Sequence, residues 1–190
     1  MASDNEEALL RSLALILTEN AGATLQEIAK AAQVSRATLY RFAATREQLL
    51  ETLNQHALKV LTQVMDNAGL ETRPPLEALN RLIASYIAER EFCAFIISQF
   101  APCIKRNIET GIPDEHALFE QRLDLFFQQG QAAGVFRINI PSRWLTDVFF
   151  GFIYVLCESE CRGRIARAEM QTLFEDMFLN GAQSSPLDGH

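Results

Sequence analysis

The sequence predicts an all-α protein in which a small N-terminal unit of three helices is joined by a long helix to a larger helical body. Apolar residues recur at helical spacing through most of the chain, and Ser and Thr residues suited to N-caps precede three successive segments before residue 50. No stretch of useful length shows the alternation of a strand. All six prolines follow residue 73, where they separate the helices of the body.

The N-terminal unit begins with a helix predicted over residues 5–20. Thr24 and Glu27 then have the spacing of a capping box, which begins a second, short helix. Ser35 is a natural N-cap for a third helix. These signals predict two short helices separated by a tight turn.

The fourth helix is predicted to begin at Thr45, with Gln48 as its capping partner, and to extend to Ala68 before Gly69. At about 1.5 Å per residue it spans roughly 35 Å, enough to reach a second domain. Two short helices followed by the start of a longer one are the pattern of a helix-turn-helix. That unit places its second helix in the major groove of DNA.

The charge distribution favours DNA binding by this segment over a helical subdomain with ordinary solvated charges. From Thr24 to Arg46 the chain has four basic residues and one acid, a local charge of +3, whereas the whole chain carries −7. Attraction for phosphate is therefore confined to one end of the protein. The outer face of the predicted third helix carries Arg36, Thr38, Tyr40 and Arg41.

The segment resembles the DNA-binding domain of TetR-family transcriptional regulators. The residues that align with the family motif are Ile28, Ala29, Ala32, Gln33, Val34, Ser35, Thr38, Leu39, Tyr40, Arg41, Arg46 and Leu49, of which Gln33 departs from it. The resemblance implies that the recognition helix carries Arg36, Ala37, Thr38, Tyr40 and Arg41, and that Arg46 meets a phosphate. It also implies a double-stranded DNA operator, a homodimer and a small-molecule effector.

Three positions depart from the family pattern. Gln33 stands at a turn position that is usually Gly, and a left-handed backbone there would cost a non-Gly residue roughly 1 kcal/mol. Ala37 replaces another Gly, and residues 42–44 read Phe-Ala-Ala in place of an aromatic-Phe-Pro run. These departures concern the geometry of the turns and leave the predicted fold unchanged.

The boundaries give a helix-turn-helix DNA-binding domain over residues 1–46, a helical ligand-binding and dimerisation domain over 47–181 and a disordered tail over 182–190. In the second domain, residues 104–111 are predicted as a short helix or a loop. The other predicted helices cover residues 74–89, 90–100, 113–133, 142–162 and 165–180.

Twelve of the thirteen Phe residues follow residue 90, where they either fill the core or line a small-molecule pocket of the kind that the resemblance implies. Asp147, Gly151, Tyr154 and Glu158 share one helical face, which either contacts water or a partner subunit or holds an organic cation near aromatic rings. The predicted ligand residues are Phe92, Phe95, Phe127, Asp147, Phe149, Tyr154 and Glu158.

The last two helices are predicted to supply the homodimer interface as well as part of the core. A dimer places two recognition helices about 34 Å apart, so the operator is expected to be near-palindromic. The residues considered for the interface or the core are Val148, Phe152, Val155, Leu156, Met170, Leu173, Phe174, Met177 and Phe178.

Several classes of function are disfavoured. The chain has no Gly-rich phosphate loop, His-Glu-x-x-His or Gly-x-Ser-x-Gly motif, so we expect no enzyme, cofactor or metal site. No apolar run reaches the ~18 residues of a membrane span, and the acidic N-terminus does not resemble a signal peptide, so a cytoplasmic protein is expected. Cys157 and Cys161 are interpreted as small hydrophobes, with thiol sensing as the alternative.

The sequence therefore predicts a ligand-responsive transcriptional regulator. We expect a repressor that leaves its operator when a small aromatic or amphipathic molecule binds, with organic cations among the candidates. The alternatives are a helical carrier or enzyme with no DNA role, and a regulator with no ligand.

Overall fold

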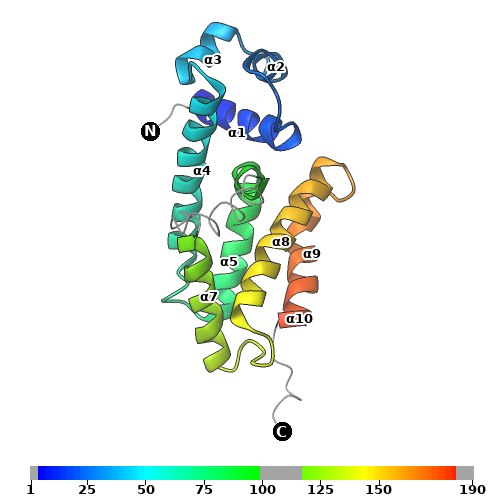
Figure 1. The fold of residues 1–190 in the computed structure, drawn as a ribbon. Helices are drawn as coiled ribbons and strands as arrows, with labels where there is room; N and C mark the ends of the chain where they lie inside the picture. The colour runs from blue at the N-terminus through cyan, green and yellow to red at the C-terminus, as the bar shows by residue number, and fades with distance from the viewer. Residues whose placement is uncertain (1–3, 99–116, 183–190) are drawn as a thin grey trace.

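The computed structural model describes residues 4–98 and 117–182, and within these ranges the secondary structure is helical, with no strand (Figure 1). The all-α prediction is confirmed. The first four helices are α1 (Asp4–Glu19), α2 (Leu25–Ala31), α3 (Arg36–Phe42) and α4 (Arg46–Ala68). Then follow α5 (Pro75–Ala88), a helical segment at residues 90–98, α7 (Ala117–Ala132) and α8 (Ser142–Cys161).

The chain ends in a composite helical stretch where the sequence predicts one helix over residues 165–180. Its parts are η1 (Arg167–Glu169), α9 (Met170–Phe174), the π-helical η2 (Glu175–Leu179) and α10 (Asn180–Ala182). The π-helical turn is not predicted, because apolar spacing does not distinguish a single wide turn from an α-helix.

Figure 1 shows α1, α2 and α3 together at one end of the molecule, around the start of α4. We call α1, α2 and α3 the head, and the helices from α5 onward the body; α4 joins the two. From the head, α4 extends along α5, against which it packs, while α7 packs against α8. The long helix therefore makes a continuous physical connection between head and body.

The N-terminal caps of α2 and α3 form as predicted. The backbone N–H of Thr24 donates to Glu27 Oε2 (2.8 Å) and that of Glu27 donates to Thr24 Oγ1 (3.3 Å), which completes the capping box. Ser35 Oγ accepts from the backbone N–H of Thr38 (3.0 Å). In each of the two short helices, a side chain thus satisfies one of the N–H groups that the first turn leaves free.

The predicted capping box of α4 forms only in part. Thr45 Oγ1 accepts from the backbone N–H of Gln48 (3.2 Å), but Gln48 Oε1 accepts from Ala44 N–H (3.0 Å) rather than from that of Thr45. The hydrogen bond from Ala44 N–H to the Gln48 side chain therefore holds the turn after α3. At the other end, Gly69 has the left-handed conformation (φ 72°) that ends the helix, as predicted.

The turn between α2 and α3 is left-handed at a residue with a side chain. Gln33 has φ 55°, its N–H donates to Lys30 O (3.2 Å), and Val34 N–H donates to Ala29 O (3.0 Å). These two hydrogen bonds form a Schellman motif, in which the left-handed position is usually occupied by glycine. The left-handed backbone expected at this position is confirmed.

One apolar core extends from the head into the body. In the body, aromatic rings meet edge to face, for example Phe149 with Phe174 (centroids 5.2 Å apart) and Phe127 with Phe136 (5.2 Å). Gly130 lies directly under the Phe136 ring, where a β-carbon would come within 2.3 Å of a ring carbon. The connection from α7 to α8 is thereby packed onto the core.

Part of the predicted secondary structure lies outside the described residues. This applies to residues 99–100 and 104–111, to the start of the helix predicted over 113–133 and to the predicted tail from residue 183. Among the helices that the structure does describe, none combines the length and apolar character needed to cross a lipid bilayer.

Candidate DNA interface and ligand pocket

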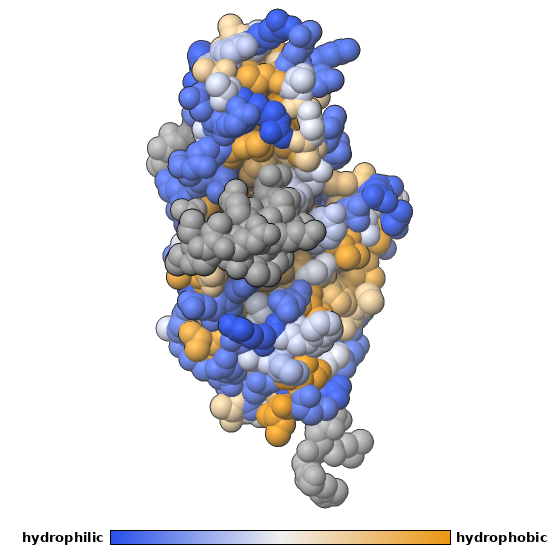
Figure 2. Space-filling model, viewed as in Figure 1, coloured by the Kyte–Doolittle hydropathy of each residue, from blue (hydrophilic) through white to orange (hydrophobic). Residues whose placement is uncertain are grey.

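The outward face of α3 is open at the tip of the head. Leu39 is buried against the core, whereas Arg36 and Arg41 are exposed and the Tyr40 side chain is 54% exposed. Hydrophilic residues cover much of the outer surface of the head in Figure 2. The cap at Ser35 holds the start of this helix, so two guanidinium groups and one phenol are presented on a short, fixed helix.

The other two predicted contacts of α3 are placed differently. Ala37 is exposed and adds no polar group, so it leaves room for a close approach by DNA. Thr38 is half-buried, and its hydroxyl lies 2.9 Å from Ser35 Oγ, within the N-cap. These placements bring all five predicted α3 residues to one short helix, and their contact with DNA stays a prediction.

Arg46 is engaged within the head. Its guanidinium donates through Nε to Ala23 O (3.2 Å) and through Nη2 to Ala21 O. Both carbonyls belong to the loop between α1 and α2, so Arg46 attaches this loop to the start of α4. The family resemblance does not reveal this role, and a phosphate contact by Arg46 stays a prediction.

Arg11 of α1 joins the head to the body. Its Nη2 lies 2.6 Å from Glu89 Oε2 and its Nη1 lies 3.5 Å from Glu91 Oε2, and the guanidinium carbon is 5.0 Å from the centroid of the Phe92 ring. Ion pairing and cation–π attraction therefore act on one side chain. This contact was not predicted, because its partners are about 80 residues apart in the sequence.

The same junction reaches α4 and α8. The His56 ring of α4 packs edge-on against Phe92 (5.1 Å), and Arg90 contacts Glu91 (2.8 Å) and Glu160 of α8 (3.3 Å). The side chains of Arg90 and Glu91 are each 15% exposed. Residues 89–92 thus contact α1, which belongs to the head, and also α4 and α8.

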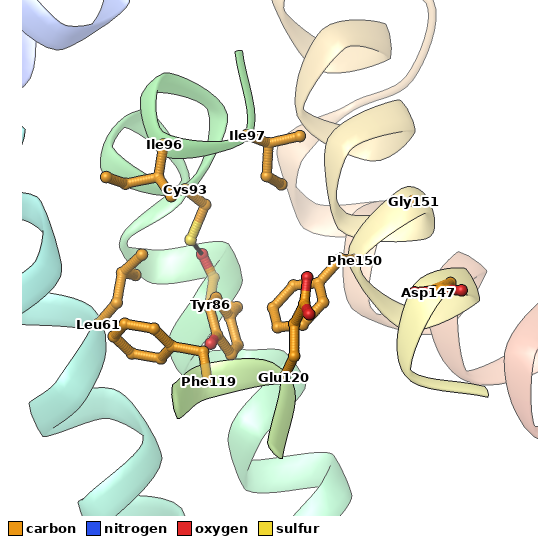
Figure 3. A pocket seen from close by; sticks show the side chains of 10 residues that line it. All are labelled: Leu61, Tyr86, Cys93, Ile96, Ile97, Phe119, Glu120, Asp147, Phe150 and Gly151. Carbon is orange, nitrogen blue, oxygen red and sulfur yellow. Dashed lines mark hydrogen bonds between the residues drawn. The ribbon is translucent and has the colours of Figure 1, made fainter. Parts of the chain in front are cut away.

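A pocket of about 200 Å³ lies within the body (Figure 3). Its described wall comes from α4, α5, residues 90–98, α7 and α8, and it is mainly apolar. The lining residues are Leu61, Tyr86, Cys93, Ile96, Ile97, Phe119, Glu120, Asp147, Phe150 and Gly151. In Figure 3, Tyr86, Phe119 and Phe150 form one side of the pocket, and Cys93, Ile96 and Ile97 lie across from them.

The two buried titratable groups of the pocket wall are neutral at physiological pH. Burial raises the pKa of the Tyr86 phenol and the pKa of the Cys93 thiol well above their ordinary values. The thiol donates a hydrogen bond to the carbonyl oxygen of Tyr86 (3.5 Å). Glu120 and Asp147 supply the carboxylates of the wall.

Of the seven predicted ligand residues, Asp147 lines this pocket. Tyr154 is half-buried outside it, and Glu158 pairs with Arg162 (2.6 Å) rather than facing the cavity. The other four are rings that pack in the core without exposed surface, and none is among the described lining residues: Phe92, Phe95, Phe127 and Phe149. Helical spacing alone does not tell which of two buried faces borders a cavity, so their contact with a ligand stays a prediction.

Tyr86, Phe119 and Phe150 are pocket residues that the sequence reasoning did not select. Phe119 and Phe150 belong to the Phe-rich half of the chain, which was the available signal. Tyr86 has no comparable signal, because it occupies an ordinary apolar position of α5. Only the packing of α5 against α8, with the Tyr86 and Phe150 ring centroids 6.2 Å apart, places it in the wall.

The cysteines of α8 do not have the environment of reactive thiols. Burial raises the pKa of Cys157 to about 12, and the pKa of Cys161 is also raised, chiefly by desolvation and then by Glu160. A thiol must lose its proton to act as a nucleophile. The interpretation of Cys157 as a small buried hydrophobe therefore fits better than thiol sensing.

The last two helices turn an apolar face outward. Trp144, Val155 and Met177 are 59%, 57% and 64% exposed. Of the residues considered for an interface or the core, Val148, Phe152 and Leu173 are half-buried, and the remaining four are buried within the chain: Leu156, Met170, Phe174 and Phe178. The nine positions thus divide between the core and an open surface.

A capped helix-turn-helix joined by one long helix to an all-helical body with an apolar pocket defines a class of DNA-binding regulators. The family model of bacterial regulatory proteins of the tetR family matches residues 13–53, which cover α2, α3 and parts of α1 and α4. The chain is 38% identical over 180 residues to the HTH-type transcriptional regulator NfxB of Pseudomonas aeruginosa, a match that covers 95% of each protein. The chain belongs to the TetR family of transcriptional regulators and is not an enzyme.

Other matches agree with this assignment. The transcriptional repressor LfrR of Mycolicibacterium smegmatis is 25% identical over 146 residues, which cover 77% of this chain and 74% of LfrR. The structure of LfrR in complex with proflavine is similar with a TM-score of 0.64 at 22% identity, covering 92% and 94% of the two chains. The ketosteroid regulator KstR2 of Mycobacterium tuberculosis shares the fold with a TM-score of 0.69 at 18% identity, covering 97% and 98%.

Proposed function

We propose that this chain is a homodimeric repressor that binds a near-palindromic operator through α3 and leaves it when a small aromatic or amphipathic molecule occupies the body pocket. The domain division at residues 46 and 47 and a location in the cytoplasm, where bacterial operators lie, are part of this proposal. The observation that carries it is the open face of α3, with Arg36, Tyr40 and Arg41 exposed on a capped helix.

The chemistry of that face suits duplex DNA. Arginine binds phosphates and guanine edges, and a phenol donates to phosphate oxygens. Residues 24–46 carry a local charge of +3, whereas the chain as a whole carries −7, so attraction for phosphate is concentrated on this segment. A helical carrier or enzyme would have no use for this distribution of charge.

The effector part of the proposal rests on the pocket. Three aromatic rings in its wall suit a flat apolar molecule, and the carboxylates of Glu120 and Asp147 would favour a positive charge on it. The related LfrR has been captured with proflavine, a flat aromatic compound. We therefore include aromatic cations among the candidate effectors.

The proposed route of regulation is the Arg11 junction. Cys93, Ile96 and Ile97 line the pocket from the helical segment whose first residues contact Arg11 of the head. A ligand that shifts this segment would change how the head is held. The coupling is then a difference in ligand affinity between two head positions.

The proposed dimer uses the outward apolar face of the last two helices. A monomer would leave Trp144, Val155 and Met177 in water, and a two-fold contact would bury this face on both copies. Sedimentation velocity at micromolar protein concentration measures the oligomeric state directly. A monomer under those conditions would contradict this part of the proposal.

The DNA role is tested with operators selected from random duplexes and measured by fluorescence anisotropy. We expect Arg36→Ala and Tyr40→Ala each to weaken binding about tenfold or more, because each removes a contact worth roughly 1–3 kcal/mol. If Arg36 contacts a phosphate, a plot of log binding constant against log salt concentration should also be less steep for Arg36→Ala, by about one unit of slope. Arg81→Ala, an exposed arginine of α5, is the matched control and should bind as the parent does.

Three results would contradict the proposal or a part of it. Failure to enrich any duplex sequence would favour a carrier without a DNA role. Equal loss for Arg36→Ala and Arg81→Ala would mean that general charge, rather than the α3 face, governs binding. If aromatic dyes bind the protein but do not release the selected operator, regulation without a ligand would be favoured.

A further inference from the structure

Among the residues of the pocket wall that the structure describes, Tyr86 has a buried hydroxyl without a hydrogen-bond partner. Tyr86 is 2% exposed, its hydroxyl is fully buried, and the hydroxyl has no hydrogen-bond partner. The other buried polar group of the wall, the Cys93 thiol, is satisfied by the carbonyl of Tyr86. An unpaired buried hydroxyl is unfavourable, and native proteins rarely keep one without a reason.

The surroundings of this hydroxyl are aromatic. The Tyr86 ring packs edge-on against Phe149 (5.7 Å) and Phe150 (6.2 Å), and Phe119 lies on the same side of the pocket in Figure 3. Burial keeps the phenol protonated, so it has a hydrogen to donate. A neutral phenol in a mainly apolar wall therefore favours a ligand that carries a hydrogen-bond acceptor at this point.

Phe119 separates this pocket from a second cavity. The half-buried ring lines both the pocket and a groove of about 510 Å³ between α4 and α7, whose wall includes Leu58, Leu118 and Leu125. Phe119 thus borders the wall that holds Tyr86 on one side and the open groove on the other.

We infer that Tyr86 is the hydrogen-bonding subsite of the effector pocket, and that its ligand is an apolar aromatic molecule carrying a hydrogen-bond acceptor such as a carbonyl oxygen or ring nitrogen. This inference rests on the proposed effector role of the pocket and adds the chemistry that the ligand must have. The aromatic body packs against Phe119 and Phe150, and its acceptor receives the phenolic hydrogen that no described protein group accepts.

The test uses two fluorescent probes that differ by the acceptor. One is 6-acetyl-2-dimethylaminonaphthalene, and the other is 2-dimethylaminonaphthalene, which lacks the acetyl carbonyl. Tyr86→Phe removes only the hydroxyl, so it should weaken binding of the acetyl probe about fivefold to tenfold. It should leave the affinity for the second probe within about twofold. Emission of the bound acetyl probe should also shift to shorter wavelength in Tyr86→Phe, because a donor to its carbonyl is lost.

The isosteric variant is expected to fold, since it removes an unsatisfied group from the core, and its melting temperature should equal or exceed that of the parent. Equal losses for the two probes, or unchanged emission, would overturn the inference while leaving the pocket as an effector site. Failure of both probes to bind the parent protein would instead count against the effector pocket. The two proposals therefore fail in different ways.

Discussion

Gly130→Ala is expected to destabilise the protein although it places a better helix former within α7. Gly130 lies under Phe136, and an added β-carbon would be 2.3 Å and 2.4 Å from two carbons of that ring. Carbon atoms in contact prefer about 3.5–4.0 Å, so the ring would have to retreat by at least about 1 Å.

The ring has little room for this movement. Phe136 has no exposed surface, and the rings of Phe126 (5.7 Å) and Phe127 (5.2 Å) pack against it. Overpacking of such a core costs typically 1–3 kcal/mol, and we expect the upper end because three rings must shift together. The gain in helix propensity offsets about 1 kcal/mol. The net loss is then about 2 kcal/mol, or about 4–8 °C in melting temperature.

Thermal and urea unfolding followed by circular dichroism, at one protein concentration, measure this loss. Gly181→Ala is the matched control, because a β-carbon there has no atom within 4 Å and should be neutral or stabilising by up to about 1 kcal/mol. In a Phe136→Leu background the cost of Gly130→Ala should largely disappear. A Gly130→Ala protein as stable as the parent would refute the close-packing explanation.

Two further changes test the head and its attachment. Gln33→Gly should raise the melting temperature by about 1–4 °C, because relief of the left-handed strain outweighs the added freedom of the unfolded chain; a lower melting temperature would contradict the strained turn. Arg11→Met should lower the free energy of unfolding by about 1–2 kcal/mol, because Glu89 and Glu91 lose their shared partner. In urea unfolding, Arg11→Met should cost less in a Glu89→Gln background, and strictly additive effects would exclude the ion pair.

The elements that the sequence predicts correctly are those set by near neighbours. Capping at Thr24 and Ser35 depends on residues three positions away, and the end of α4 depends on a glycine next to it. The left-handed turn at Gln33 is also local, since both of its hydrogen bonds connect residues no more than five apart. For these features the pattern of residue types is sufficient, because the backbone groups to be satisfied are fixed by the helix itself.

The sequence by itself therefore determined the all-α class, the helix-turn-helix and the exposure of Arg36, Tyr40 and Arg41 on α3, because helical period and caps decide them. Only the tertiary structure decided which ring borders the pocket and which fills the core. Tyr86 and Phe149 both occupy apolar helical positions, yet Tyr86 is among the described lining residues of the pocket and Phe149 is not. It also decided that Arg11 binds Glu89 and Glu91 across the head–body junction. Such contacts depend on how whole helices pack, and that packing arises from many weak, non-directional interactions that short sequence patterns do not encode.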